Sequence, residues 1–172
     1  DESVATVDEN WNITAVKLGT TYIRIEDSTN GIYGSVKVNV TDNGGIAFAK
    51  IVGGNNNFIS LKTDGAVWTW GVNSNGQLGL GDNVNKNEPT KTNITDAIDI
   101  AAGNEFSAVL RKDGTVWTTG NNTYGQLGDG TNNSRNIFGK VEGLTNVIAI
   151  TAESNSLHAL KADGTVWSWG YN

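Results

Sequence analysis

One ten-residue phrase occurs three times in this chain. It reads KTDGAVWTWG over residues 62–71, RKDGTVWTTG over 111–120 and KADGTVWSWG over 161–170, at offsets of 49 and 50 residues. The match extends without a gap upstream to residues 54, 103 and 153, and GQLG recurs at 76–79 and 125–128. A fixed period near 50 residues is typical of propellers and solenoids, in which each unit needs its neighbours to bury a core.

Each copy of the phrase predicts a β-hairpin. An Asp-Gly pair stands between two alternating apolar runs, and Asp-Gly suits a two-residue type I′ turn. Residues 58–62 are therefore expected to pair with 66–70, with the repeated valine and the repeated tryptophan on opposite faces of the sheet. Both faces would then be buried between neighbouring sheets. The repeat positions are Asp64, Gly65, Val67, Trp68, Asp113, Gly114, Val116, Trp117, Asp163, Gly164, Val166 and Trp167.

The longer pattern DGxVWxWGxNxxGQLG resembles the repeat of the regulator of chromosome condensation family, whose members build β-propellers. Residues 51–172 carry it as units over 51–99, 100–149 and 150–172, and the last unit stops before its own GQLG. The resemblance implies four-stranded propeller blades, incomplete in this chain. The family's usual histidine is replaced by Asn57, Phe106 and Ser156, so a binding role for that histidine does not carry over.

Residues 1–42 differ in pattern from the repeats. Alternating runs at 3–8, 13–23 and 36–40 are separated by turn residues, and SVATVD followed by TA and GT resembles the C-terminal half of a bacterial immunoglobulin-like domain of group 2. We therefore expect a partial β-sandwich over 1–42 and a linker over 43–50. Half a sandwich and an unfinished blade both leave strand edges bare, so we expect a window on a longer protein.

Composition supports an all-β chain and argues against some classes of binding partner. There are 22 glycines and one proline, and no apolar pattern keeps a helical period. The net charge is −6, without the basic face that nucleic acid or anionic lipid would need. The chain has no cysteine for a disulfide or a thiolate metal site, and no apolar run long enough to insert into a membrane.

The sequence predicts no catalytic, cofactor or metal site. His158 is the only histidine and falls on a predicted strand, so we interpret it as structural. Asp82 and Asp129 open Asn-rich loops over 82–86 and 129–133 that offer oxygen ligands to Ca²⁺, but capped, solvated loops explain them as well. No helix follows GQLG to bind a phosphate. The expectation is a protein that is not an enzyme and holds no cofactor.

One loop aromatic stands out as a candidate contact residue. Tyr124 lies just before the second GQLG, where the first unit has Asn75, and Phe138 is a second aromatic outside the repeat pattern. Loops on rigid scaffolds commonly carry recognition. The candidate interaction loop therefore consists of Tyr124, Asn75 and Phe138.

The leading functional hypothesis is a binding, adhesion or display module of an exported bacterial surface protein, located outside the cell and using propeller loops to contact a protein or a glycan. Three alternatives stay open. The chain is also compatible with a secreted inhibitor similar to the β-lactamase inhibitory propeller, or with nucleotide exchange on a small GTPase, as in the eukaryotic family member. The fourth hypothesis is a structural subunit whose open blade edges pair between copies.

Overall fold

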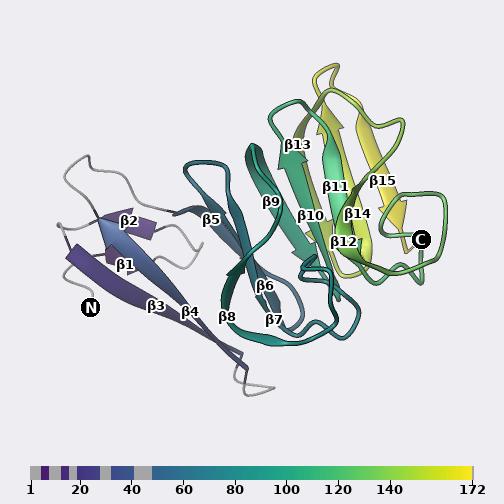
Figure 1. The fold of residues 1–172 in the computed structure, drawn as a ribbon. Coiled ribbons are helices and arrows are strands. Elements are labelled where there is room, and N and C mark those ends of the chain that lie inside the picture. Colours follow the sequence, from purple (N-terminus) through teal and green to yellow (C-terminus); the bar gives the residue numbers. More distant parts are fainter. Residues whose placement is uncertain (1–4, 8–12, 16–18, 28–31, 41–47, 172) are drawn as a thin grey trace.

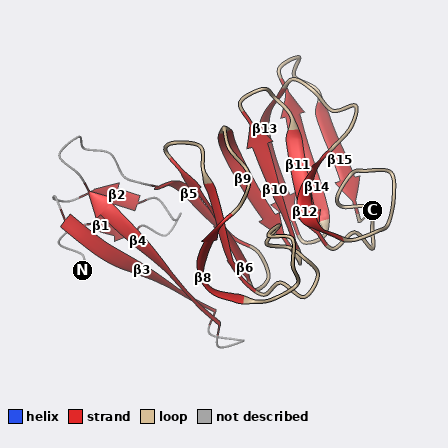
Figure 2. Ribbon diagram, viewed as in Figure 1, coloured by secondary structure: helices blue, strands red, loops and turns tan. Residues whose placement is uncertain are grey.

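The computed structural model describes residues 5–7, 13–15, 19–27, 32–40 and 48–171, with side chains from residue 49 onward. Within these ranges all regular structure is β-strand, as predicted (Figure 2). No helix able to cross a membrane occurs in this part of the chain.

Three antiparallel sheets follow one another along the repeat region (Figure 1). In each sheet every strand pairs with the next one in sequence, which confirms the predicted blades. Blade 1 consists of β5 (Phe48–Gly53), β6 (Asn57–Lys62), β7 (Val67–Gly71) and β8 (Lys86–Lys91). Blade 2 consists of β9 (Ala97–Gly103), β10 (Phe106–Arg111), β11 (Val116–Gly120) and β12 (Arg135–Lys140). Blade 3 consists of β13 (Val147–Glu153), β14 (Ser156–Lys161) and β15 (Val166–Gly170).

Each blade begins three residues before the unit that the repeat alignment predicted. The first strands start at Phe48, Ala97 and Val147, instead of at 51, 100 and 150. The predicted boundaries therefore cut through β5, β9 and β13, and the predicted linker over 43–50 overlaps the start of β5. The offset arises because a strand needs backbone pairing and not sequence identity: Phe48 pairs with Lys62, and Ala97 with Arg111.

Two antiparallel strand pairs occur among the described residues of the N-terminal part. Strand β1 (Ala5–Val7) pairs with β2 (Ile13–Ala15), and β3 (Gly19–Asp27) pairs with β4 (Ile32–Val40). The three runs predicted there correspond to four described strands, because the run over 13–23 is divided between β2 and β3. The immunoglobulin-like sandwich itself stays a prediction.

The Asp-Gly turns differ from the predicted type I′ turn. In blade 1 the Gly65 N–H donates to the Lys62 carbonyl at 3.0 Å and the Lys62 N–H to the Ala66 carbonyl at 2.9 Å, which gives a three-residue loop. Only the glycine has positive φ, +81° at Gly65, whereas a type I′ turn needs two such residues. This is a type I turn followed by a glycine bulge. The aspartate selects it, because the Asp64 carboxylate accepts the Ala66 N–H at 3.0 Å.

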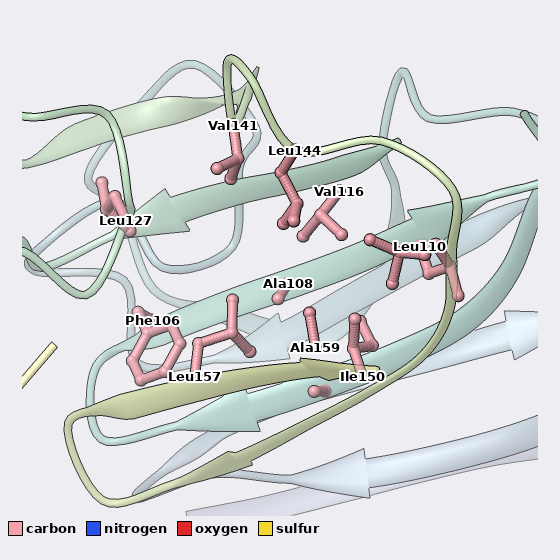
Figure 3. Packing of buried hydrophobic residues seen from close by; sticks show 12 residues of the cluster. Phe106, Ala108, Leu110, Val116, Leu127, Val141, Leu144, Ile150, Leu157 and Ala159 are labelled. Atoms are coloured by element: carbon pink, nitrogen blue, oxygen red, sulfur yellow. The ribbon is translucent and has the colours of Figure 1, made fainter. Parts of the chain in front are cut away.

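The core lies between successive blades. Ile59, Leu61 and Val67 of blade 1 pack against a buried row of blade 2, namely Ile100, Ala102 and Val109. The opposite face of blade 2 packs on blade 3 in the same way, as Figure 3 shows. The second cluster includes Phe106, Ala108, Leu110, Val116, Leu127, Val141, Leu144, Ile150, Leu157 and Ala159.

The outer face of blade 3 is uncovered within the described part of the chain. Val166 is 65% exposed, whereas Val67 and Val116 at the same repeat position are fully buried. Leu160 and His158 lie on this face, where the His158 Nδ1 and the Ser168 hydroxyl are 2.8 Å apart. The prediction that both faces of each repeated strand are buried is therefore confirmed for blade 2 and does not hold for blade 3.

Candidate interaction surface

The strand directions divide the connections between two ends of the blade stack. Residues 54–56, 72–85, 104–105, 121–134 and 154–155 form one end, here called the loop end. The short connections over 63–66, 92–96, 112–115, 141–146 and 162–165 form the other, the turn end. The loop end holds the long Asn-rich segments in which the sequence placed Tyr124 and Asn75.

A buried asparagine organises each long loop. The Asn122 side chain is fully buried, and its amide donates to Asp129 Oδ1 at 3.1 Å and to the Thr131 carbonyl at 3.0 Å. Its oxygen accepts the Leu127 N–H at 2.9 Å and so holds the turn formed by GQLG itself, in which the Gly128 N–H donates to the Gly125 carbonyl. Asn73 makes the equivalent bonds to Leu78 and Asp82 in blade 1. The spacing NxxGQLG is therefore explained by loop folding, because the buried asparagine holds both sides of the loop together.

Asp82 and Asp129 cap these loops. The Lys86 ammonium, 2.8 Å away, and the Val84 N–H hold the pKa of the Asp82 carboxyl below its ordinary value. Burial raises the pKa of Asp129, but the N–H and hydroxyl of Thr131 and the Asn122 amide outweigh it, so the pKa is lowered overall. Both carboxylates thus already accept hydrogen bonds from protein groups, as expected for capped loops.

Tyr124 is half-exposed at the loop end, with 47% of its surface accessible. Its ring meets that of Tyr171 edge to face, with centroids 4.9 Å apart. Tyr171 directly follows β15 and is 64% exposed, and its backbone is held by an N–H bond to the Asn155 carbonyl at 3.0 Å. The loop of blade 2 and the end of blade 3 therefore jointly present one aromatic pair, here called the tyrosine pair.

The other two candidate contact residues lie elsewhere. Asn75 is partly buried in the loop of blade 1, where its N–H donates to the Gln77 side chain at 2.9 Å. Phe138 is not on a loop: it lies in β12, is 7% exposed and packs in the cluster between blades 1 and 2. The prediction that Phe138 belongs to the interaction loop is therefore wrong, because its side chain is buried in the core between blades 1 and 2.

The repeated tryptophans sit at the turn end, each beside a cation. Lys62 Nζ lies 4.6 Å from the Trp68 ring centroid, and the Arg111 guanidinium carbon lies 5.5 Å from that of Trp117. In blade 3 Lys161 lies 5.8 Å from Trp167. Trp117 also packs on the cluster between blades 1 and 2, as predicted. The cations were missed by the sequence reasoning, although the alignment contains a basic residue at all three positions.

Three buried side-chain donors of blade 1 have no partner among the described residues, namely Trp68 Nε1, Trp70 Nε1 and Gln77 Nε2. For Trp68 and Gln77 the loss follows from a single substitution in the repeat. The Trp117 Nε1–H donates to the Thr115 hydroxyl at 3.1 Å, but Ala66 occupies that position in blade 1, and Trp68 Nε1 has no partner among the described residues. Likewise Val72 stands where Asn121 accepts from the Gln126 amide at 3.5 Å, and in the described part Gln77 Nε2 is unpaired. Such groups cost stability when buried.

Replacing Ala66 by threonine is expected to raise the free energy of unfolding by about 1 kcal/mol. The new hydroxyl can accept from Trp68 Nε1 and donate to Asp64, as Thr115 donates to Asp113 at 2.6 Å in blade 2. Urea unfolding followed by tryptophan fluorescence measures the change. Ala66→Val is the control, because it adds the same bulk without the hydroxyl; an equal gain in both variants would assign the effect to packing.

Comparison with known proteins identifies the repeat. Two family models, both described as regulator of chromosome condensation (RCC1) repeat, match the chain, one over residues 64–110 and 113–155 and the other over 48–77 and 97–126. No curated protein matches the chain in sequence.

Solved structures show the same fold. Human WBSCR16 is 23% identical with a TM-score of 0.69, over 80% of this chain and 35% of that protein. Yeast RCC1 (Prp20), solved with Kap60, is 23% identical with a TM-score of 0.65, over 73% of this chain and 32% of that one. The chain thus spans about a third of the length of these propellers.

Proposed function

Because this chain belongs to the regulator of chromosome condensation (RCC1) repeat family, we propose that it is a protein-binding module whose contact surface is the loop end around the tyrosine pair. Among the similar structures, yeast Prp20 was solved bound to Kap60, and Prp20p was studied for its binding to Gsp1p and histones. These examples concern those proteins, but they support a binding role on this fold.

The exposed tyrosine pair carries the proposal. Tyrosine offers a large, stiff contact area with a polar tip, and such residues commonly dominate binding energy at protein interfaces. Tyr124 and Tyr171 are held by backbone hydrogen bonds, so ordering them on binding costs little conformational entropy. The buried Asn122 below them keeps the loop in one shape.

Protein capture with variants tests this surface. Wild-type chain and the Tyr124→Ala/Tyr171→Ala double variant are immobilised and exposed to extract from the source organism. For at least one captured protein, the amount retained by the double variant is expected to be lower than that retained by the wild type by about tenfold or more, because the loss of hot-spot residues commonly has effects of this size. Val84→Ala is the matched control, because Val84 is 62% exposed in a loop of the same end. Identical capture by wild type and double variant would contradict the proposal.

The resemblance of residues 1–42 to a bacterial immunoglobulin-like domain supports a finer version of this function. In it, the module is displayed on the outside of a bacterial cell and acts in adhesion or recognition of a protein or glycan. Labelling of intact cells with an antibody against the blades tests the location. Staining only after permeabilisation would contradict it.

A further inference from the structure

The loop end of the blade stack carries more acidic than basic residues. Its loops, with the strand residues that border them, contain the acids Asp82, Glu105, Asp129 and Glu153 and the bases Lys86 and Arg135. Both bases are already paired: the Lys86 ammonium lies 2.8 Å from the Asp82 carboxylate. The Arg135 guanidinium lies 3.5 Å from the Asp129 carboxylate and also donates to the Thr118 carbonyl. Glu105 and Glu153 form no ion pair with any residue that the structure describes, so their negative charge is uncompensated.

Glu105 is partly buried and is joined to the loop that carries Tyr124. Its Oε2 accepts a hydrogen bond from the Asn121 amide at 3.0 Å, and its backbone carbonyl accepts the Asn121 N–H at 2.8 Å. Asn121 opens the loop over 121–134, three residues before Tyr124. The bond to Oε2 holds the carboxylate in place, while no described residue binds Oε1. Glu105 therefore has one oxygen available to a ligand beside Tyr124.

The turn that contains Glu105 also contacts the blade that carries Tyr171. The Asn104 N–H donates to the Ser154 carbonyl at 2.6 Å, so the turns of blades 2 and 3 pack on each other. In the second turn the Asn155 carbonyl accepts the Tyr171 N–H at 3.0 Å. Hydrogen bonds therefore connect Glu105 to both members of the tyrosine pair, and the carboxylate and the two rings share the surface of the loop end.

The backbone of Glu105 lies in the left-handed region, with φ of +58°. The corresponding residue of blade 1 is Asn56, with φ of +73°. Asparagine adopts this conformation more readily than glutamate does, so blade 2 carries the less favourable residue type. Strained backbone of this kind is commonly found at functional sites. No described cation offsets the cost, which favours a role for the Glu105 carboxylate in binding.

We propose that the protein partner presents a basic segment to this surface, with a lysine or arginine cation paired to Glu105 and the stem of that side chain against the tyrosine pair. An ammonium or guanidinium group forms a strong, charge-assisted hydrogen bond with a carboxylate, and tyrosine rings attract cations. The methylene stems of such residues also cover apolar area. This inference rests on the function proposed above, because it names the chemistry of the partner at the same tyrosines.

A pair of peptides tests the charge. Acetyl-trilysine amide carries an ammonium group on every side chain, and the same peptide acetylated at each Nζ keeps the stems without the charge. In an NMR titration of the wild-type chain at low ionic strength, the backbone N–H signals of Glu105, Tyr124 and Tyr171 are expected to shift with the charged peptide. The acetylated peptide should bind about tenfold or more weakly, because it forms no charged pair. Equal affinities for the two peptides, or no shift with the charged one, would overturn the proposal.

A charge-removing variant locates the site. Glu105→Gln keeps an oxygen that can accept from Asn121, and it is expected to weaken binding of the charged peptide about threefold or more. Glu142→Gln is the matched control, because it removes the same charge from a carboxylate at the turn end that is 81% exposed. Equal losses in the two variants would assign the binding to net charge alone and overturn the site.

A second variant separates binding from folding. Glu105→Asn gives blade 2 the residue type of Asn56, so it is expected to be at least as stable as the wild type in urea. A loss of peptide binding in this variant then reflects the missing carboxylate. Wild-type affinity in Glu105→Asn would contradict the role of that group.

The basic segment and the contact surface can fail separately. Identical capture by the wild type and the Tyr124→Ala/Tyr171→Ala variant contradicts the tyrosine pair as a contact surface. Capture that depends on the tyrosines but is equal for the wild type and Glu105→Gln contradicts only the basic segment.

Discussion

Replacing Leu110 by alanine is expected to lower the free energy of unfolding by about 3 kcal/mol. Leu110 is fully buried and packs in the cluster between blades 2 and 3, near Val116 and Ile150 (Figure 3). Alanine removes the apolar contacts and leaves a cavity that two stacked sheets cannot close without shifting against each other. Urea unfolding measures the loss.

Leu160→Ala is the matched control for Leu110. It occupies the same repeat position in blade 3, where 36% of its surface is exposed, so the expected loss is about 1 kcal/mol or less. Equal losses at both positions would contradict this difference and indicate that another sheet covers blade 3 in solution. Sedimentation of the wild-type chain would then show whether that sheet comes from a second copy.

Replacing Asn122 by aspartate is expected to lower the free energy of unfolding by about 3 kcal/mol at neutral pH. The change keeps the shape of the side chain but replaces the donating amide with a carboxylate. The new oxygen would face Asp129 Oδ1 and the carbonyls of Thr131 and Asn133, which now accept from the amide at 3.1, 3.0 and 3.2 Å. Buried acceptors would then oppose one another without a proton between them.

Asn132→Asp makes the same chemical change in the same loop. Asn132 is exposed and its amide donates to the Thr123 carbonyl at 2.8 Å, so water can replace that bond and the expected loss is about 1 kcal/mol or less. Chemical denaturation of both variants measures the difference. A loss for Asn122→Asp no greater than that for Asn132→Asp would show that the buried amide does not hold the loop.

The candidate site was only partly predictable. Tyr124 stood out because it interrupts the repeat, but its partner Tyr171 carries no sequence signal, since the contact joins loops of two different blades. Phe138 has the same kind of signal as Tyr124, yet it is buried. A non-repeated aromatic fills a core or meets solvent according to which face of its strand the neighbouring blade covers. The cleft between blades 1 and 2, lined by residues such as Ile94, Trp117 and Phe138, was not predictable, because its walls come from five separate segments.

The sequence by itself determined the repeat, the hairpins and the order of strands within each blade, because these depend on local alternation and on turn residues close together in the chain. Turn geometry was predictable only in part. Asp64 and Gly65 indicated a tight turn, but the bond from the Ala66 N–H to the Asp64 carboxylate stabilises a three-residue loop in place of the predicted two-residue turn. Only the tertiary structure decided which residues at the same repeat position are buried and which are exposed. Val116 is buried and Val166 is exposed, because blade 3 covers the first and no described sheet covers the second.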